Sequence, residues 1–336
     1  MKKLIGGLCL LSASIMLMGC SKKKDYDFKY DGEGYGKGYI TYYHNSKKKS
    51  WYEAFKEEEI YDQEGKQLYH VFYSLKDGKL RLKCLHTYKY DENNLLIEKD
   101  VDEYYIANGK EVVSPSSRIE YAYEGTTLTE EIGYSKDYLN GGILSLSTKI
   151  NYTYDSRDNL TKEVRSSYNS NNSTWVEFNV REYTYDSSNN KLSYTSTGSI
   201  FGECKESIVY SYDSNNNLIK KEYEYEDSSE SNKSETIYVY ENNLLKKETT
   251  YDIATDNSKK ELYNVDYTYN SNNDVSTKLT INNSEGYSFI YNEKEEYIYD
   301  SNNELKTYIH NISETNPDSW YANRKYEYFT KTYKKK

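Results

Sequence analysis

The sequence predicts an all-β fold, an antiparallel meander of about 21 strands in which hairpin units of about 30 residues repeat. Three observations support this prediction. Tyrosines recur at an even spacing, apolar and polar residues alternate ahead of them, and Asp- and Asn-rich segments follow them. Because the repeat alone does not set the curvature, the single long sheet is expected to curve or wind into a spiral or an open barrel.

A Tyr-x-Tyr-like motif identifies each unit, and we use its second aromatic residue as the marker. Successive markers lie 27 to 33 residues apart. The markers are Tyr30, Tyr61, Tyr90, Tyr123, Tyr154, Tyr185, Tyr212, Tyr240, Tyr269, Tyr299 and Tyr328. Such even spacing predicts one repeat domain over residues 28–336. The first two units are degenerate and the last is short, which is typical of terminal repeats that cap a repeat array.

Strands are predicted ahead of the markers because apolar residues there recur at every second position. One such set is Leu80, Leu82, Cys84, His86, Tyr88 and Tyr90. Another is Leu144, Leu146, Thr148, Ile150, Tyr152 and Tyr154. Ahead of Tyr185, however, Val176, Phe178 and Val180 have the opposite parity. A β-bulge near Arg181 would reconcile the two sets.

Turns are predicted after the markers, as in Asp213-Ser-Asn-Asn-Asn217 between Tyr212 and Leu218. Asn and Asp tolerate positive φ and form hydrogen bonds with nearby backbone groups, so this segment suits a hairpin turn. Its Asp-x-Asn-x-Asn spacing also matches the first half of a calcium loop. The Gly at the sixth position and the Glu at the twelfth are missing, so a plain turn is favoured over a metal site.

The N-terminus predicts export and a lipid anchor. Lys2 and Lys3 precede an apolar run over 4–18, which is too short to span a membrane comfortably. The run ends in Leu17-Met18-Gly19-Cys20, which resembles the bacterial lipobox, although Met18 stands where Ala or Ser is usual. The resemblance implies a signal peptide over 1–19, acylation of Cys20 and a tether over 20–27. It also implies an envelope location, at the outer membrane or cell surface rather than the cytoplasmic membrane.

Composition limits the partners. The chain has a formal net charge of −10, so phosphate neutralisation of a nucleic acid is not expected. It contains 43 Tyr but only 7 Phe, so any core must be built largely from tyrosine. The expected partners are the membrane, through the lipid, and a protein or glycan at the surface, with the chain itself a monomer.

The turn segments "YDSRDNL" and "YDSNNNL" resemble the YD repeat of bacterial Rhs-type proteins, Tyr-Asp-x-x-Gly-Asn-Leu. At the glycine position this chain has residues that can share the left-handed conformation, namely Asp158, Asn216 and Asn303. The resemblance implies antiparallel hairpins joined into one wound sheet. The protease-like core segment and effector domain of a large Rhs toxin are missing. A weaker likeness to MORN-type repeats lies in "YSLKDGKL".

No catalytic, metal-binding or cofactor-binding residue is predicted. The four histidines lie in four different units without HxH or HExxH spacing, and no phosphate loop or nucleophile motif occurs. Adjacent carboxylates such as Glu295 and Glu296 should point to opposite faces of a strand. The chain is therefore not expected to be an enzyme.

The paired tyrosines define a candidate aromatic face. It comprises Tyr121, Tyr123, Tyr152, Tyr154, Tyr183, Tyr185, Tyr210, Tyr212, Tyr238, Tyr240, Tyr267, Tyr269, Tyr297 and Tyr299. This face is either the packed side of the sheet or an open surface that stacks on a ligand. Cys84 and Cys204 share its parity, and an open sheet would hold them too far apart for a disulfide, so both are predicted to be free and buried.

Three functions remain after these exclusions. A structural, adhesive or protein-binding role is favoured because repeat sheets offer extended contact surfaces. Capture of a glycan or peptide by exposed tyrosines is the alternative. A pore is third, because a membrane barrel needs an apolar outer band and both predicted faces here carry Lys and Glu.

Overall fold

The computed structural model describes residues 28–45, 48–76, 79–108, 110–137, 142–198, 204–283, 292–313 and 321–334. The predicted signal peptide, Cys20 and the tether lie outside the described residues. The described residues form 20 strands and no helix. The strands are β1 Gly34–Asn45, β2 Ser50–Tyr61, β3 Gln67–Lys76, β4 Lys79–Tyr90, β5 Leu96–Ala107, β6 Lys110–Glu124, β7 Thr127–Asp137, β8 Ile143–Tyr154, β9 Leu160–Asn169, β10 Thr174–Tyr185, β11 Lys191–Gly198, β12 Cys204–Tyr212, β13 Leu218–Glu226, β14 Ser231–Glu241, β15 Leu244–Ile253, β16 Lys259–Tyr269, β17 Val275–Asn282, β18 Asn292–Tyr299, β19 Leu305–Ser313 and β20 Tyr321–Tyr333.

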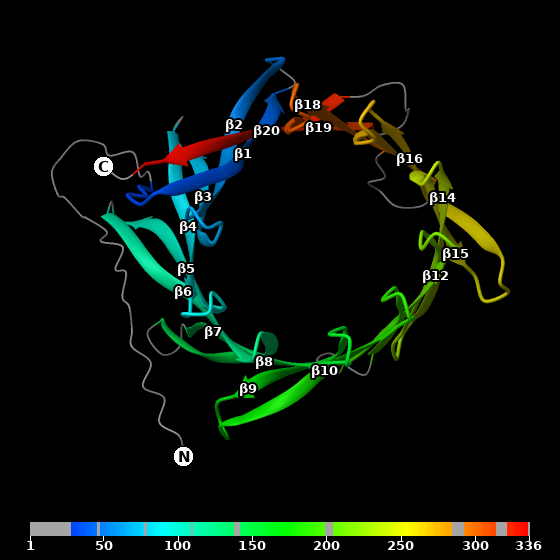
Figure 1. Cartoon of the computed structure of the whole chain (residues 1–336), viewed down its shortest axis with the longest axis horizontal. Coiled ribbons are helices and arrows are strands. Elements are labelled where there is room, and N and C mark those ends of the chain that lie inside the picture. Colours follow the sequence, from blue (N-terminus) through cyan, green and yellow to red (C-terminus); the bar gives the residue numbers. More distant parts are fainter. Residues whose placement is uncertain are drawn as a thin grey trace.

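Each strand pairs antiparallel with its neighbours in the sequence, and β1 also pairs with β20. The sheet therefore closes into a ring in which the first and last strands lie side by side (Figure 1). The predicted all-β antiparallel meander is confirmed, with 20 strands. Its curvature, which the sequence left open, is that of a closed barrel, not a spiral or an open barrel.

The two chain ends together form one hairpin of the ring. The marker Tyr328 lies in β20 and faces Tyr39 of β1, so β20 acts as the first strand of a unit and β1 as the second. The expectation that the terminal units cap an array is therefore wrong. Each end is half a repeat, and the two halves complete each other because neither has another strand to pair with.

Among the described residues, a β-bulge recurs beside each of the nine hairpin turns that follow a marker. In β12 and β13, Tyr212 faces Leu218 and Ser211 faces Lys220, which leaves Ile219 as the extra residue. The same one-residue shift accompanies the other eight turns. Bulges bend a strand and increase its twist, so these nine bulges contribute to the curvature that closure requires, whereas the β1–β20 pairing is regular.

Further β-bulges near the other ends of some strands place certain residues on the side of the sheet opposite to the predicted one. Skipped residues at Lys83 and Ser147 place Leu82 opposite Tyr73 and Leu146 opposite Tyr134. Both leucines thus leave the tyrosine side of the sheet. The bulge predicted near Arg181 lies at Phe178.

The bulge at Phe178 brings only one of the two neighbouring valines, Val176 and Val180, to the tyrosine side of the sheet. Val176 faces Ser167 and so joins the tyrosine side. Val180 faces Val164 and stays on the other side.

The Asp213–Asn217 turn forms as predicted, through an Asp side chain and a left-handed residue. Asp213 Oδ1 accepts the backbone N–H groups of Asn215 and Asn217, both at 2.8 Å. Asn216 has φ of 62°, and the equivalent Asp158 and Asn303 have φ of 62° and 63°. The positions where the YD repeat carries glycine are therefore the left-handed positions of these turns.

We expect Asn216→Val to destabilise the β12–β13 hairpin by roughly 1–3 kcal/mol, because a β-branched residue resists positive φ. Asn216→Gly should be neutral or slightly stabilising, and Asn215→Val serves as the matched control at a neighbouring exposed position. Chemical denaturation of the three variants measures the effect. Equal midpoints for the two Val variants would contradict the assigned turn geometry.

A buried apolar cluster lies beneath the overlapping chain ends. It comprises Ile60, Val71, Tyr73, Leu82, Leu85 and Tyr104, and Phe28, Tyr30, Tyr69 and Tyr333 pack against it. It lies on the side of the sheet opposite the marker tyrosines, since Ile60 precedes Tyr61 on β2. A Cβ on Gly36 would lie 2.8 Å from Glu58 Oε1, so this glycine permits the close approach of β1.

Candidate binding surface

The fourteen tyrosines of the candidate aromatic face are all half-buried. On one side of the sheet they recur from hairpin to hairpin, and we call this side the tyrosine face. They are neither sealed in a core nor freely exposed. Each tyrosine is surrounded by side chains that neighbouring strands present on the same side of the sheet.

The marker hydroxyls join successive hairpins. Tyr212 donates to the carbonyl oxygen of Lys191 at 2.8 Å, and Tyr185 donates to that of Leu160 at 2.9 Å. Tyr90, Tyr123, Tyr269 and Tyr299 make the equivalent bond to the start of the preceding second strand. Each of these bonds satisfies a half-buried hydroxyl and fixes the spacing of two units.

Several leading tyrosines instead donate to glutamates of the preceding unit. Tyr152 binds Glu131 Oε1 at 2.9 Å, and Tyr267 binds Glu248 Oε1 at 2.6 Å. Burial, followed by these glutamates, raises the pKa of both tyrosines. The hydroxyls of the tyrosine face are thus used largely within the barrel.

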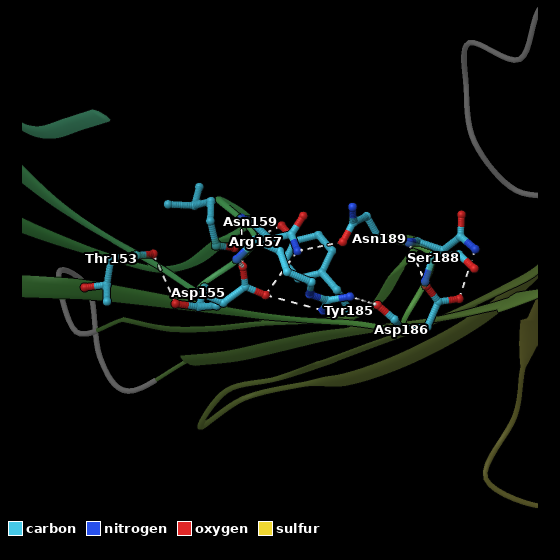
Figure 2. Close-up of polar contacts among 11 residues, drawn as sticks. Thr153, Asp155, Arg157, Asn159, Tyr185, Asp186, Ser188 and Asn189 are labelled. Atoms are coloured by element: carbon cyan, nitrogen blue, oxygen red, sulfur yellow. Dashed lines mark hydrogen bonds and ion pairs between the residues drawn. The ribbon is translucent and has the colours of Figure 1, made fainter. Parts of the chain in front are cut away.

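The nine turns lie at one end of the barrel, which we call the turn rim. Neighbouring turns are joined there by side-chain hydrogen bonds (Figure 2). Asn159 Nδ2 donates to Asn189 Oδ1 at 3.0 Å, and Arg157 Nη1 donates to the carbonyl oxygen of Asp186 at 2.7 Å. Hydrogen bonds from the Asn159 side chain and backbone lower the pKa of Asp155 to about 2. Many polar groups of the turn rim therefore hold the turns together.

The opposite ends of the strands form the return rim, where aromatic side chains gather. The seam cluster is the group on β1, β2 and β20 made of Tyr43, Tyr52, Phe55 and Arg324, which share one side of the sheet. The alternating residues His44, Trp51 and Lys325 lie on the other side. Tyr43 contacts Tyr52 and Phe55, with ring centroids 6.2 and 6.1 Å apart, and Arg324 lies 5.4 Å over Tyr43. Tyr52 is 48% exposed and Phe55 is 42% exposed. This cluster is an accessible aromatic and basic surface.

Exposed apolar residues near the turn rim differ from this cluster. They are aliphatic and occur singly on separate strands, as with Ile97, Leu192, Val239 and Ile298. Scattered residues of this kind are ordinary on protein surfaces, whereas a contiguous patch indicates an interaction site. The sequence prediction missed the seam cluster because its members lie on strands from opposite ends of the chain.

Cys84 and Cys204 are free thiols, as predicted, and lie on the tyrosine face. Their strands, β4 and β12, are eight positions apart in the ring. They are half-buried instead of fully buried, because most of the tyrosine face retains some exposure. Burial raises the pKa of the Cys84 thiol, which disfavours the reactive thiolate.

Two histidines that the sequence assigned to different units lie together. His70 faces His86 across β3 and β4, with ring centroids 5.5 Å apart, and Phe72 packs against both. Burial lowers the pKa of His86 to about 4. Among the described residues, no group of three or more His, Cys, Asp and Glu side chains could hold a metal ion. The described chain also contains no helix long and apolar enough to cross a membrane.

Comparisons with known proteins assign no family. No family model matches the chain, and no curated protein matches it. A protein of unknown function from Bacteroides fragilis aligns with 20% identity and a TM-score of 0.31, over 37% of this chain and 87% of its own. A porin-like protein from Bacteroides uniformis aligns with 10% identity and a TM-score of 0.37, over 88% of this chain and 97% of its own.

The TcdB2-TccC3-Cdc42 structure aligns with 11% identity and a TM-score of 0.40, over 85% of this chain and 19% of that one. These likenesses are too low to assign a function.

Proposed function

We propose that this protein is a non-catalytic, lipid-anchored barrel of the bacterial cell envelope, of YD-repeat type, that binds a partner protein through its seam cluster. The observation that carries the proposal is the cluster itself. Tyr, Trp and Arg are the residue types most enriched at the energetic centres of protein interfaces. Here Tyr52 and Phe55 are accessible beside Tyr43 and Arg324, which gives aromatic anchors and a basic group in one patch.

The position of the predicted lipid anchor supports binding of a partner at the seam cluster. Strand β1 starts at the turn rim, because Tyr35 faces Tyr61, the residue just before the Asp62 turn. A lipid on Cys20 would therefore attach at the turn rim. The return rim and its seam cluster would then face away from the membrane, where a partner can reach them.

A membrane-spanning pore is less well supported by the strands. In β13, Lys220, Glu222 and Glu224 lie on one side of the sheet, while Lys221 faces Tyr210 on the tyrosine face. Charged side chains on both sides interrupt the apolar band that a lipid-facing surface needs.

Stacking of a glycan on the tyrosine stripes is the alternative binding function. Bonds already made by hydroxyls such as those of Tyr212 and Tyr267 would leave mainly ring surfaces for it.

Photo-crosslinking in intact cells tests the binding surface. We expect benzoylphenylalanine in place of Tyr52 to crosslink one predominant protein, and Phe55→Ser in the same chain to weaken that product severalfold. The matched control replaces Val239, which is 51% exposed at the turn rim. Identical adducts from both positions, or none from position 52, would refute the proposed surface.

Membrane fractionation tests the predicted lipid anchor. We expect Cys20→Ala to move the protein from the membrane fraction to the soluble fraction, because acyl chains on that thiol would supply most of the membrane affinity. A variant that stays in the salt-washed membrane pellet at the wild-type level would count against lipidation.

A further inference from the structure

We propose that a cavity on the side of the sheet opposite the tyrosine face binds an alkylammonium group, carried by a lysine side chain or by a free polyamine. The cavity has a volume of about 490 Å³ and lies over β4, β5 and β6. It contains none of the seam-cluster residues, so the inference goes beyond the proposed function and does not depend on it.

The cavity combines a polar floor with an apolar wall. Thr87, Asp100 and Arg118 line it and face one another across β4, β5 and β6. Ile143 and Leu144, the first residues of β8, line it from the adjoining hairpin. A ligand held here would contact charged groups at one end and aliphatic side chains along its length.

The two carboxylates of the cavity floor, Asp100 and Asp102, differ in the partners that they have. Arg118 Nε donates to Asp100 Oδ1 at 2.7 Å, and Lys89 Nζ binds Asp100 Oδ2 at 2.9 Å, so both oxygens of Asp100 are occupied. Asp102 lies two residues further along the same side of β5 and also lines the cavity. Within the described part of the chain, Asp102 makes neither a hydrogen bond nor an ion pair.

Asp102 is therefore a half-buried carboxylate that forms no ion pair itself, although the charges of Arg118 and Lys89 act on it from a distance. Burial, followed by the charge of Asp100, raises the pKa of Asp102. At neutral pH a cation bound beside it would relieve the cost of holding that charge away from water. The cavity thus offers a specific gain to a positively charged ligand.

The lining favours an organic cation over a metal ion. Calcium and magnesium require several oxygen ligands. Here both oxygens of Asp100, the other carboxylate of the lining, are already bound to Arg118 and Lys89, so Asp102 alone offers free carboxylate oxygens. An ammonium group needs only one carboxylate, and its aliphatic stem can pack against Ile143 and Leu144.

Isothermal titration of the purified barrel with three probes tests the inference. The probes are cadaverine, the peptide acetyl-Ala-Lys-Ala-amide and the same peptide with norleucine in place of lysine. We expect an amine probe to bind and the norleucine peptide not to bind. Asp102→Asn, which keeps the side-chain shape, should weaken binding by about tenfold or more, which corresponds to the loss of one charge contact. Glu103→Gln, at an exposed neighbouring position, is the matched control and should leave binding unchanged.

The binding measurements support or overturn the inference that the cavity binds an alkylammonium group. Binding of cadaverine alone assigns a free polyamine, and binding of the lysine peptide alone assigns a side chain of a partner. Failure of both amines to bind, equal binding of the norleucine peptide, or wild-type affinity in a folded Asp102→Asn protein would overturn the inference. Far-UV circular dichroism verifies that each variant is folded.

Discussion

Deletion of residues 321–336 is expected to leave no folded monomer, because it removes β20 and opens the ring. Strand β20 faces Gly34–Tyr43 of β1 on one side and β19 on the other. Its loss would expose two long strand edges, which are templates for aggregation. It would also remove Tyr333, which contacts the buried Glu58 and Tyr30. Size-exclusion chromatography and circular dichroism measure the outcome.

A circular permutant provides the matched control for this deletion. Joining the C-terminus to residue 28 with a short linker and opening the chain between Asn215 and Asn216 keeps all 20 strands and only moves the split hairpin. It should fold as a monomer, since closure is preserved. A truncated chain that remained monomeric with the wild-type melting temperature would show that the β1–β20 pairing is dispensable.

Alkaline pH is expected to unfold the barrel cooperatively between about pH 10 and 12. Burial, followed by the charge of Glu131, raises the pKa of Tyr121 to about 12, and burial with Glu248 does the same for Tyr238. An unfolded tyrosine titrates near pH 10. The folded state keeps these protons while the unfolded state loses them, so stability is intact below about pH 10 and falls as pH rises toward 12. Many tyrosines should act together in this transition.

Absorbance at 295 nm, followed together with far-UV circular dichroism, measures this transition. Ionisation of most tyrosines should coincide with loss of strand signal. Glu248→Gln should shift the coupled transition, because the carboxylate charge acts on Tyr238 and Tyr267. Titration of the tyrosines near pH 10 with an unchanged strand signal would mean that their hydroxyls are not held inside the barrel.

Local features were predictable because they depend on residues close together in the chain. The Asp213–Asn217 turn follows from Asp and Asn chemistry within five residues, and the left-handed Asn216 follows from its position in that turn. The strand type and the approximate number of strands follow from period-two alternation and the repeat spacing. The free state of Cys84 and Cys204 follows from counting strands between them.

Some details of register could not be read from the sequence. The extra residues at Lys83 and Ser147 move Leu82 and Leu146 to the other side of the sheet. A bulge is selected by the strand that pairs with it, and the single-strand pattern does not contain that information. The bulge at Phe178, three residues from the expected position, has the same origin.

The sequence by itself determined the repeat, its turns and the alternation that makes each unit a hairpin, since these are local consequences of tyrosine spacing and Asp and Asn chemistry. Only the tertiary structure decided that the sheet closes, because closure joins Gly34–Tyr43 to residues at the far end of the chain. The same closure places Arg324 over Tyr43 at the seam. Contacts between residues almost 300 positions apart depend on the summed twist of all the intervening strands, and no short stretch of sequence specifies that sum.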